Sequence, residues 1–134
     1  MKKIGTINTH LSRIIASMGH TDRLVICDSG LPIPRGSDLI DLALTTNIPR
    51  FLDTLDVVLE ELEVEEAIIA EELEQTGNSV GAGLMERLAN IRLRKVSHET
   101  FKQITSNGGN IAFVRTGEAT PYANVILIAG VTFG

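Results

Sequence analysis

The sequence predicts an α/β protein, a single three-layer domain with a largely parallel central sheet flanked by helices. Strand-like apolar runs alternate with segments of helical spacing along the chain, which is typical of parallel strands joined by crossover helices. The 134 residues suit one domain with a substantial core, and no repeat with a period of about 20 to 50 residues is present. We therefore expect residues 1–134 to form one domain.

The first helix and the first strand lie in the N-terminal part of the chain. Residues 8–18 place apolar side chains at helical spacing, with either Asn8 or Thr9 as the cap. A strand then begins near Arg23 and carries four consecutive apolar residues, LVIC, before Asp28. An unbroken apolar run of this kind is typical of a strand that is buried on both faces.

The same alternation continues to the C-terminus. Prolines and a glycine between positions 31 and 38 indicate an irregular loop, and Ser97 is a typical helix N-cap. The remaining expected elements are a strand at 38–44, a helix at 49–62, a strand at 65–73, a helix at 80–90, a strand at 91–97, a helix at 98–108, and strands at 110–117 and 124–133.

Composition and charge exclude several classes of protein. The formal net charge is −5 and the 12 Lys and Arg residues are scattered, which argues against a nucleic-acid partner. The single cysteine excludes a disulfide framework within one chain, and no apolar run approaches the roughly 20 residues of a membrane helix. Because the start, MKKIGTINTHL, soon turns polar, we expect no signal peptide and a cytoplasmic protein.

Two ionisable side chains lie at the ends of the first predicted strand. Asp28 follows its C-terminal end, and His20 precedes its start. In open parallel sheets, ligands bind outside the carboxyl ends of the strands, where loops can present polar groups. Asp28 is therefore a candidate site residue, and His20 is its candidate companion.

A third candidate, His98, opens a predicted helix directly after the Ser97 cap. The positive partial charge of a helix N-terminus disfavours a charged imidazole, so we expect a neutral ring that can donate or accept a hydrogen bond. Lys102 lies four residues later and projects from the same helical face. We include Lys102 among the expected ligand contacts, although His98 could instead serve only in the capping turn.

The segment RTGEATPYANVIL, residues 115–127, lies between the last two apolar strands. It contains Glu118, Tyr122 and Asn124 beside a glycine and a proline. This composition is poor for packing and suited to presenting polar atoms. We therefore expect a ligand-binding loop here.

Two further segments carry weaker signals. The acidic stretch at 60–74 lacks the alternating carboxylates and central glycine of a calcium loop, which favours a solvated face. The glycine-rich segment GNSVGAG, residues 77–83, matches neither the dinucleotide fingerprint nor the P-loop. We interpret it as a flexible turn.

Four motifs, taken in order, indicate a family. These are GHTD, DSGLPIP, SHETFK and TGEATPYANVIL. With these motifs at these distances, the sequence resembles the D-ribose pyranase family, within the ribose pyranase and fucose mutarotase superfamily. The resemblance runs from the N-terminus to AGVTF, and DSGLPIP and TPYAN resemble the ribose type.

The resemblance implies an enzyme that interconverts β-D-ribopyranose and β-D-ribofuranose without a cofactor, ahead of ribose phosphorylation. It implies that His20 is the proton donor and that no metal takes part. It also implies a homodecamer of two five-membered rings, in which Tyr122 and its neighbours reach the site from an adjacent subunit. The sugar contacts that it implies are Asp28, His98, Tyr122, Asn124 and the backbone of Ala123.

The implied chemistry suits these residues. Ring opening removes a proton from the anomeric hydroxyl and delivers one to the ring oxygen, and a histidine can carry a proton both ways near neutral pH. We expect the first strand to hold His20 and Asp28 so that both ends meet at one sugar. Two other interpretations stay open, a sugar-binding module without catalysis and a zinc or iron site formed by His20, Asp28 and His98.

Overall fold

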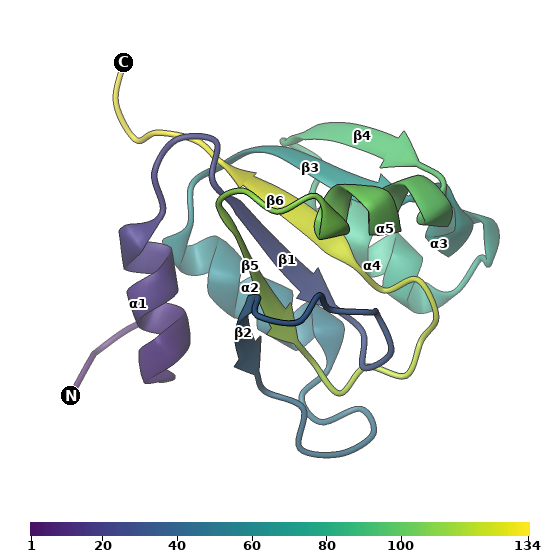
Figure 1. Ribbon diagram of the computed structural model, residues 1–134, viewed down its shortest axis with the longest axis horizontal. Helices are drawn as coiled ribbons and strands as arrows, with labels where there is room; N and C mark the ends of the chain where they lie inside the picture. The colour runs from purple at the N-terminus through teal and green to yellow at the C-terminus, as the bar shows by residue number, and fades with distance from the viewer.

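A six-stranded sheet forms the centre of the structure, a computed structural model that describes residues 1–134 (Figure 1). Its strands are β1 (Arg23–Cys27), β2 (Asp38–Asp41), β3 (Val64–Ala70), β4 (Arg92–Val96), β5 (Ile111–Arg115) and β6 (Val125–Ala129). The spatial order is β2-β5-β1-β6-β3-β4. The pairs β1–β5, β2–β5 and β3–β4 are parallel, whereas β6 is antiparallel to both β1 and β3. Five strands therefore share one direction, as the largely parallel prediction requires.

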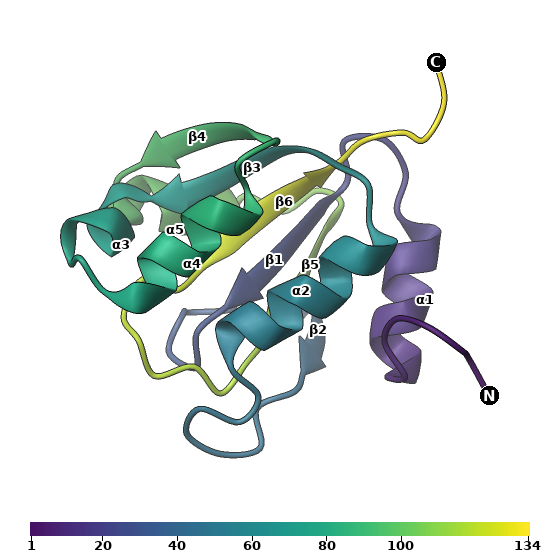
Figure 2. The same cartoon turned by 180° about the vertical axis from the view of Figure 1, so that it is seen from behind.

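Helices cover both faces of this sheet. They are α1 (Thr9–Ser17), α2 (Phe51–Glu61), α3 (Glu71–Gln75), α4 (Ser79–Arg87) and α5 (His98–Ser106). Figures 1 and 2 show α5 on one face, and α2 and α4 on the other. The predicted three-layer α/β class is confirmed. No helix is both long enough and apolar enough to span a membrane.

Two apolar layers hold the sheet between its helices. The larger has 18 buried residues and includes Phe51, Leu55 and Val58 of α2. The smaller has seven and places Phe101 of α5 against the sheet, beside Cys27 of β1. Burying side chains of this size stabilises the fold by roughly 1.5–3 kcal/mol each, before the entropy cost of folding.

The acidic segment after β3 differs from the prediction. We expected a strand through position 73, but β3 ends at Ala70 and residues 71–75 form α3. Glutamates are favourable in the first turn of a helix, where they face the positive end of its dipole, and α3 carries three of them there. Its Leu73 is buried in the larger apolar layer.

The glycine-rich segment is also more ordered than the expected flexible turn. Helix α4 begins at Ser79 within this segment, and Asn78 caps it by accepting a hydrogen bond from Gly81 N at 2.9 Å. A Cβ on Gly83 would lie 2.6 Å from Leu52 Cδ1 of α2. Glycine at this position therefore allows α4 to pack closely on α2, which gives the segment a structural role.

The direction of the strands gives the sheet two unlike edges. β1, β2, β3, β4 and β5 end at one of them, which we call the carboxyl edge, and the reversed strand β6 begins there. The opposite edge, which we call the amino edge, receives the segment before β1 and the segment after β6. Polar residues that are far apart in the sequence can therefore meet at the carboxyl edge.

Candidate active site

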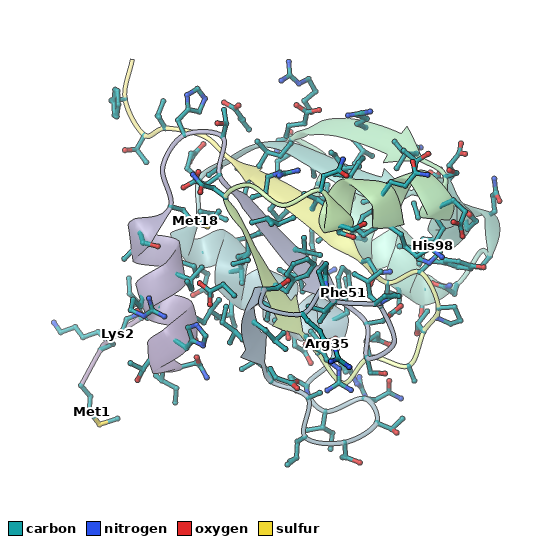
Figure 3. The ribbon with its side chains drawn as sticks, in the orientation of Figure 1. Met1, Lys2, Met18, Arg35, Phe51 and His98 are labelled. Carbon is teal, nitrogen blue, oxygen red and sulfur yellow. The ribbon has the colours of Figure 1, made fainter.

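A pocket of about 400 Å³ opens at the carboxyl edge. It is lined by residues 28–32 after β1, by residues 118–122 before β6 and by His98 after β4. Figure 3 shows His98 at the end of α5 that adjoins the loop leading into β6. The volume falls in the range typical of small-molecule sites.

Asp28 is fixed on the floor of this pocket by the turn that follows β1. Its Oδ1 accepts hydrogen bonds from Gly30 N at 3.0 Å and Leu31 N at 2.9 Å, and its own N–H donates to Asn124 Oδ1 at 2.9 Å. Burial raises the pKa of the Asp28 carboxyl, although these bonds and the nearby His98 oppose that rise. The remaining oxygen, Oδ2, contacts only Asn124 Nδ2, at 3.4 Å.

His98 and Tyr122 form the aromatic wall of the pocket. Their ring centroids lie 5.0 Å apart with planes at 77°, an edge-to-face contact. The backbone of Tyr122 has φ 66°, an uncommon conformation for a bulky residue and one that is enriched at functional sites. His98 N donates to both carboxylate oxygens of Glu72 at 3.0 Å, and Ser97 Oγ caps the first turn of α5 by accepting a hydrogen bond from Thr100 N at 3.1 Å. The predicted Ser97 cap is confirmed.

Glu118 anchors the loop that carries Tyr122. Its side chain is only 6% exposed, and its Oε1 accepts a hydrogen bond from Phe51 N, at the start of α2, at 2.9 Å. Its Oε2 accepts from Thr120 Oγ1 at 2.8 Å, and its carbonyl accepts from Ser29 N at 3.0 Å. Glu118 thus joins both loops of the pocket to a helix, one loop through its carboxylate and the other through its carbonyl.

The structure gives different places to the other predicted contacts. Asn124 and Ala123 are fully buried beneath the pocket, next to Asp28. Lys102 lies one turn along α5, where its Nζ pairs with Glu99 Oε1 at 2.8 Å, and it does not line the pocket.

Within one chain, Tyr122 and its neighbours already lie at the pocket that holds Asp28, and their expected role at the site of an adjacent subunit stays a prediction. Asn124 bonds the backbone of Asp28 in the same chain, and Tyr122 contacts His98 in the same chain. The antiparallel direction of β6 explains this arrangement, because the residues before it enter at the carboxyl edge.

His20 lies at the amino edge, far from this pocket. Met18, two residues earlier, and His98 mark opposite ends of the molecule in Figure 3. The five residues of β1 alone span roughly 16 Å between His20 and Asp28. The expectation that both ends of β1 meet at one sugar within a chain is therefore wrong.

The actual partner of His20 is Glu65, whose Oε2 lies 2.8 Å from His20 Nε2. The two histidines and Asp28 of the metal hypothesis do not converge within one chain. No group of three His, Cys, Asp or Glu side chains in the chain is arranged to hold a metal ion.

Sequence reasoning gave no role to two carboxylates that organise these regions, Glu65 and Glu72, and it named Glu118 only as a polar residue of the expected ligand loop. The first two are part of an acidic run that favoured a solvated face. The one available signal for Glu72 was its position two residues after the apolar run of β3, which is close to the signal that identified Asp28.

Together, the fold and the pocket define a class of protein. It is an α/β protein with a small polar pocket at the carboxyl edge of its sheet, formed by a carboxylate, an imidazole and a phenol. These groups suit a small ligand with many hydroxyl groups.

The chain belongs to the RbsD/FucU family. The family described as the RbsD / FucU transport protein family matches residues 1–132. A D-ribose pyranase of Coprothermobacter proteolyticus is 57% identical over 133 residues, covering 99% of this chain and 100% of the relative. A D-ribose pyranase of Symbiobacterium thermophilum is 50% identical over 133 residues, with the same coverage of both chains.

Solved structures agree with this assignment. RbsD of Bacillus subtilis, solved in complex with D-ribose, has a TM-score of 0.91 and 45% identity, covering 99% of this chain and 100% of that one. FucU of Bifidobacterium longum has a TM-score of 0.73 at 21% identity, covering 95% and 97%, and shares the fold.

Proposed function

We propose that this chain is a D-ribose pyranase, an isomerase that interconverts β-D-ribopyranose and β-D-ribofuranose. One observation carries the proposal. The polar pocket at the carboxyl edge is formed within a chain that is 45% identical over its length to a protein solved with D-ribose. Full-length relatives that are D-ribose pyranases support the same activity.

The reaction needs proton transfers and no other chemistry. A base removes the proton from O1, the C1–O1 double bond forms as the C1–O5 bond breaks, and O5 receives a proton. The open-chain aldehyde then rotates, O4 adds to C1 and loses its proton, and O1 regains one. Atoms and electrons balance without a cofactor, because the product is an isomer of the substrate.

The pocket residues bind and orient the sugar in this proposal. Asp28 Oδ2 accepts a hydroxyl hydrogen bond, and His98 and Tyr122 contact the ring beside it. Asn124, which is fully buried, holds the backbone of Asp28 in place. Lys102 reaches the sugar only if it leaves Glu99, so we place it at the rim.

His20 acts as the proton carrier from a second copy of the chain. One chain alone cannot bring His20 to its own Asp28, as the length of β1 shows. Apolar residues beside His20 support an interface there, since Val131 and Phe133 line the same hollow and are exposed in one chain. The decamer, the cytoplasmic location and a place ahead of ribose phosphorylation remain predictions.

Magnetisation-exchange NMR on D-ribose tests the activity. The purified chain should accelerate exchange between the pyranose and furanose anomeric signals, and it should act less on L-fucose. Binding of ribose without faster exchange would instead indicate a non-catalytic sugar-binding module. Activity that a chelator abolishes and zinc restores would favour the metal hypothesis.

The His20→Ala variant tests the proton carrier. We expect its catalysed exchange to fall by about 10²- to 10⁴-fold, the usual contribution of a general acid or base. Ribose binding should persist, because the pocket at the carboxyl edge is intact. Exchange at the unaltered rate would remove His20 from the mechanism.

A further inference from the structure

The backbone at His20 is fixed on both sides. Gly19 N donates to Asp22 Oδ2 at 2.8 Å, and Asp22 N donates back to Gly19 O at 3.1 Å. Thr21 N donates to Ala129 O at 2.9 Å, and Thr21 has φ 71°. A β-branched residue with positive φ is a conformational outlier that persists only where its surroundings enforce it. The turn therefore holds the His20 backbone in one position.

The partner of His20 is the extra residue of a β-bulge. The pairing of β3 with β6 shifts register between Val64 and Glu66, so Glu65 has no partner on β6. Bulges redirect a side chain, and they are over-represented next to active sites. Here the redirected side chain is the carboxylate that lies 2.8 Å from His20 Nε2.

The chain after β6 leaves room for this bulge. A Cβ on Gly130 would lie 3.2 Å from Glu65 Cβ and 3.5 Å from Glu65 N. A larger residue at this position would press on the bulge from the segment that follows β6. The approach of Gly130 is fixed, since its N–H donates to Glu63 O at 2.9 Å.

Stability does not account for this arrangement. The His20 and Glu65 side chains are 53% and 37% exposed, and exposed ion pairs contribute little to folding. A strained turn, a bulge and a glycine nevertheless converge on them. Such features typically hold a reactive side chain in position before the reaction, and an exposed histidine is a side chain of this kind.

We propose that Glu65 is the positioning residue of His20, and this rests on the proposed function. Its carboxylate accepts the Nε2–H hydrogen bond, which leaves Nδ1 as the nitrogen that exchanges protons with the sugar. The ring has no other hydrogen bond within the chain. The partner of one ring nitrogen determines which tautomer a neutral histidine adopts.

This assignment specifies the path of the proton. Neutral Nδ1 takes the proton from O1 as the C1–O1 double bond forms and the C1–O5 bond breaks. The same proton then passes from Nδ1 to O5, so His20 ends as it began. Glu65 stabilises the imidazolium that exists between the two transfers, as a carboxylate does for the histidine of a catalytic triad.

The test uses the full chain labelled with ¹⁵N in its histidine rings. The sequence has three histidines, and the signals lost in His20→Ala identify those of His20. In the unaltered chain, neutral His20 should carry its proton on Nε2. In Glu65→Gln the tautomers should mix, because an amide can either donate to Nε2 or accept from it.

Exchange kinetics on D-ribose provide the second readout. Glu65→Gln should lower kcat by about 10- to 100-fold while KM changes by less than about two-fold. Glu66→Gln is the matched control, since the next carboxylate on β3 pairs with Arg92 at 3.1 Å and not with His20. It should leave both the tautomer and kcat unchanged.

Two results would overturn the proposal, a proton on Nδ1 in the unaltered chain or a Glu65→Gln variant that behaves like Glu66→Gln. If the unaltered chain does not accelerate ribose exchange, the proposed function fails. The ring-nitrogen measurement still decides in that case, because loss of the Nε2–H tautomer in Glu65→Gln supports the positioning role and its retention refutes it.

Discussion

At the scale of single residues, the Asp28 carboxylate serves the proposed ribose binding, but its buried charge lowers the stability of the folded chain. Burial raises the pKa of its carboxyl, so the folded chain holds this proton more tightly than the unfolded chain does. The unfolded chain then binds fewer protons between the two pKa values. The protonated Asp28 carboxyl makes its full contribution to stability below the pKa that it has in the unfolded chain, about 3.9. This contribution is lost as the pH rises through the higher pKa of the folded chain.

The Asp28→Asn variant should therefore be more stable than the unaltered chain at neutral pH. The amide keeps an acceptor for Gly30 N and Leu31 N but removes the buried charge. The difference in Tm between the two proteins should shrink as the pH is lowered from about 8 to about 3. A difference that stays constant across this range would show that the charge is not the cause.

The same variant should bind ribose more weakly, because the amide nitrogen that replaces Oδ2 cannot accept a hydrogen bond from a sugar hydroxyl. Isothermal titration with D-ribose at neutral pH measures this loss. Unchanged affinity would reduce Asp28 to the structural end of β1.

At the scale of the elements, Glu118 connects the pocket to α2. Helix α2 has no side-chain cap from its own N-cap residue, Arg50. The carboxylate of Glu118 bonds the first N–H of the helix instead, and it also holds Thr120. The pocket loop and the helix should therefore lose order together if this carboxylate is removed.

Glu118→Ala should lower the free energy of unfolding by about 1–3 kcal/mol, the usual cost of leaving buried donors without a partner. Ribose affinity should fall as well, because Thr120 and Tyr122 share the loosened loop. Glu118→Gln keeps the acceptor for Phe51 N and should recover most of the stability. Urea denaturation of the three proteins measures this order, and equal losses in both variants would contradict it.

The sequence was sufficient for most elements and for three of the residues that line the pocket, Asp28, His98 and Tyr122. Apolar runs predicted the strands, and the Ser97 cap predicted where α5 begins, because both features depend on residues that are close together in the sequence. Asp28 could be predicted because it follows a strand that ends at the carboxyl edge, and His98 because it opens a helix after the Ser97 cap. The direction of β6 could not be predicted, since it depends on pairing between distant segments. That direction places Tyr122 at the pocket that holds Asp28 of the same chain.

The pairing of Glu65 with His20 was hidden for a related reason. Glu65 is one of several carboxylates in the run 60–74, and composition alone favours solvent for all of them. A one-residue register shift between β3 and β6 singles it out. Such a shift leaves no local pattern in the sequence.

At the scale of the whole molecule, the exposed apolar side chains support the proposed contact between subunits. Large apolar residues are exposed near both termini and in the loop after β2, and they are Met1, Ile4, Ile7, Leu44, Ile48, Val131 and Phe133. Contiguous exposed apolar surface marks interaction sites. The C-terminal members lie beside His20, which fits a neighbour covering the amino edge.

Phe133→Asp should weaken assembly and activity together. Phe133 is 80% exposed in one chain, so the change should barely affect the fold of a single subunit. Sedimentation velocity should show smaller species, and ribose exchange should decrease in proportion. Smaller species with full activity would mean that each chain holds a complete site.

The central claim is that each site joins His20 of one copy to the pocket of another, and subunit complementation tests it most directly. His20→Ala and His98→Ala chains are purified, shown to be inactive alone, and mixed in equal amounts under conditions that allow subunit exchange. Random mixing gives about a quarter of the interfaces an intact His20 opposite an intact pocket. The mixture should therefore recover up to about a quarter of the unaltered exchange rate. Proven mixed oligomers that remain inactive at every ratio would contradict the shared site.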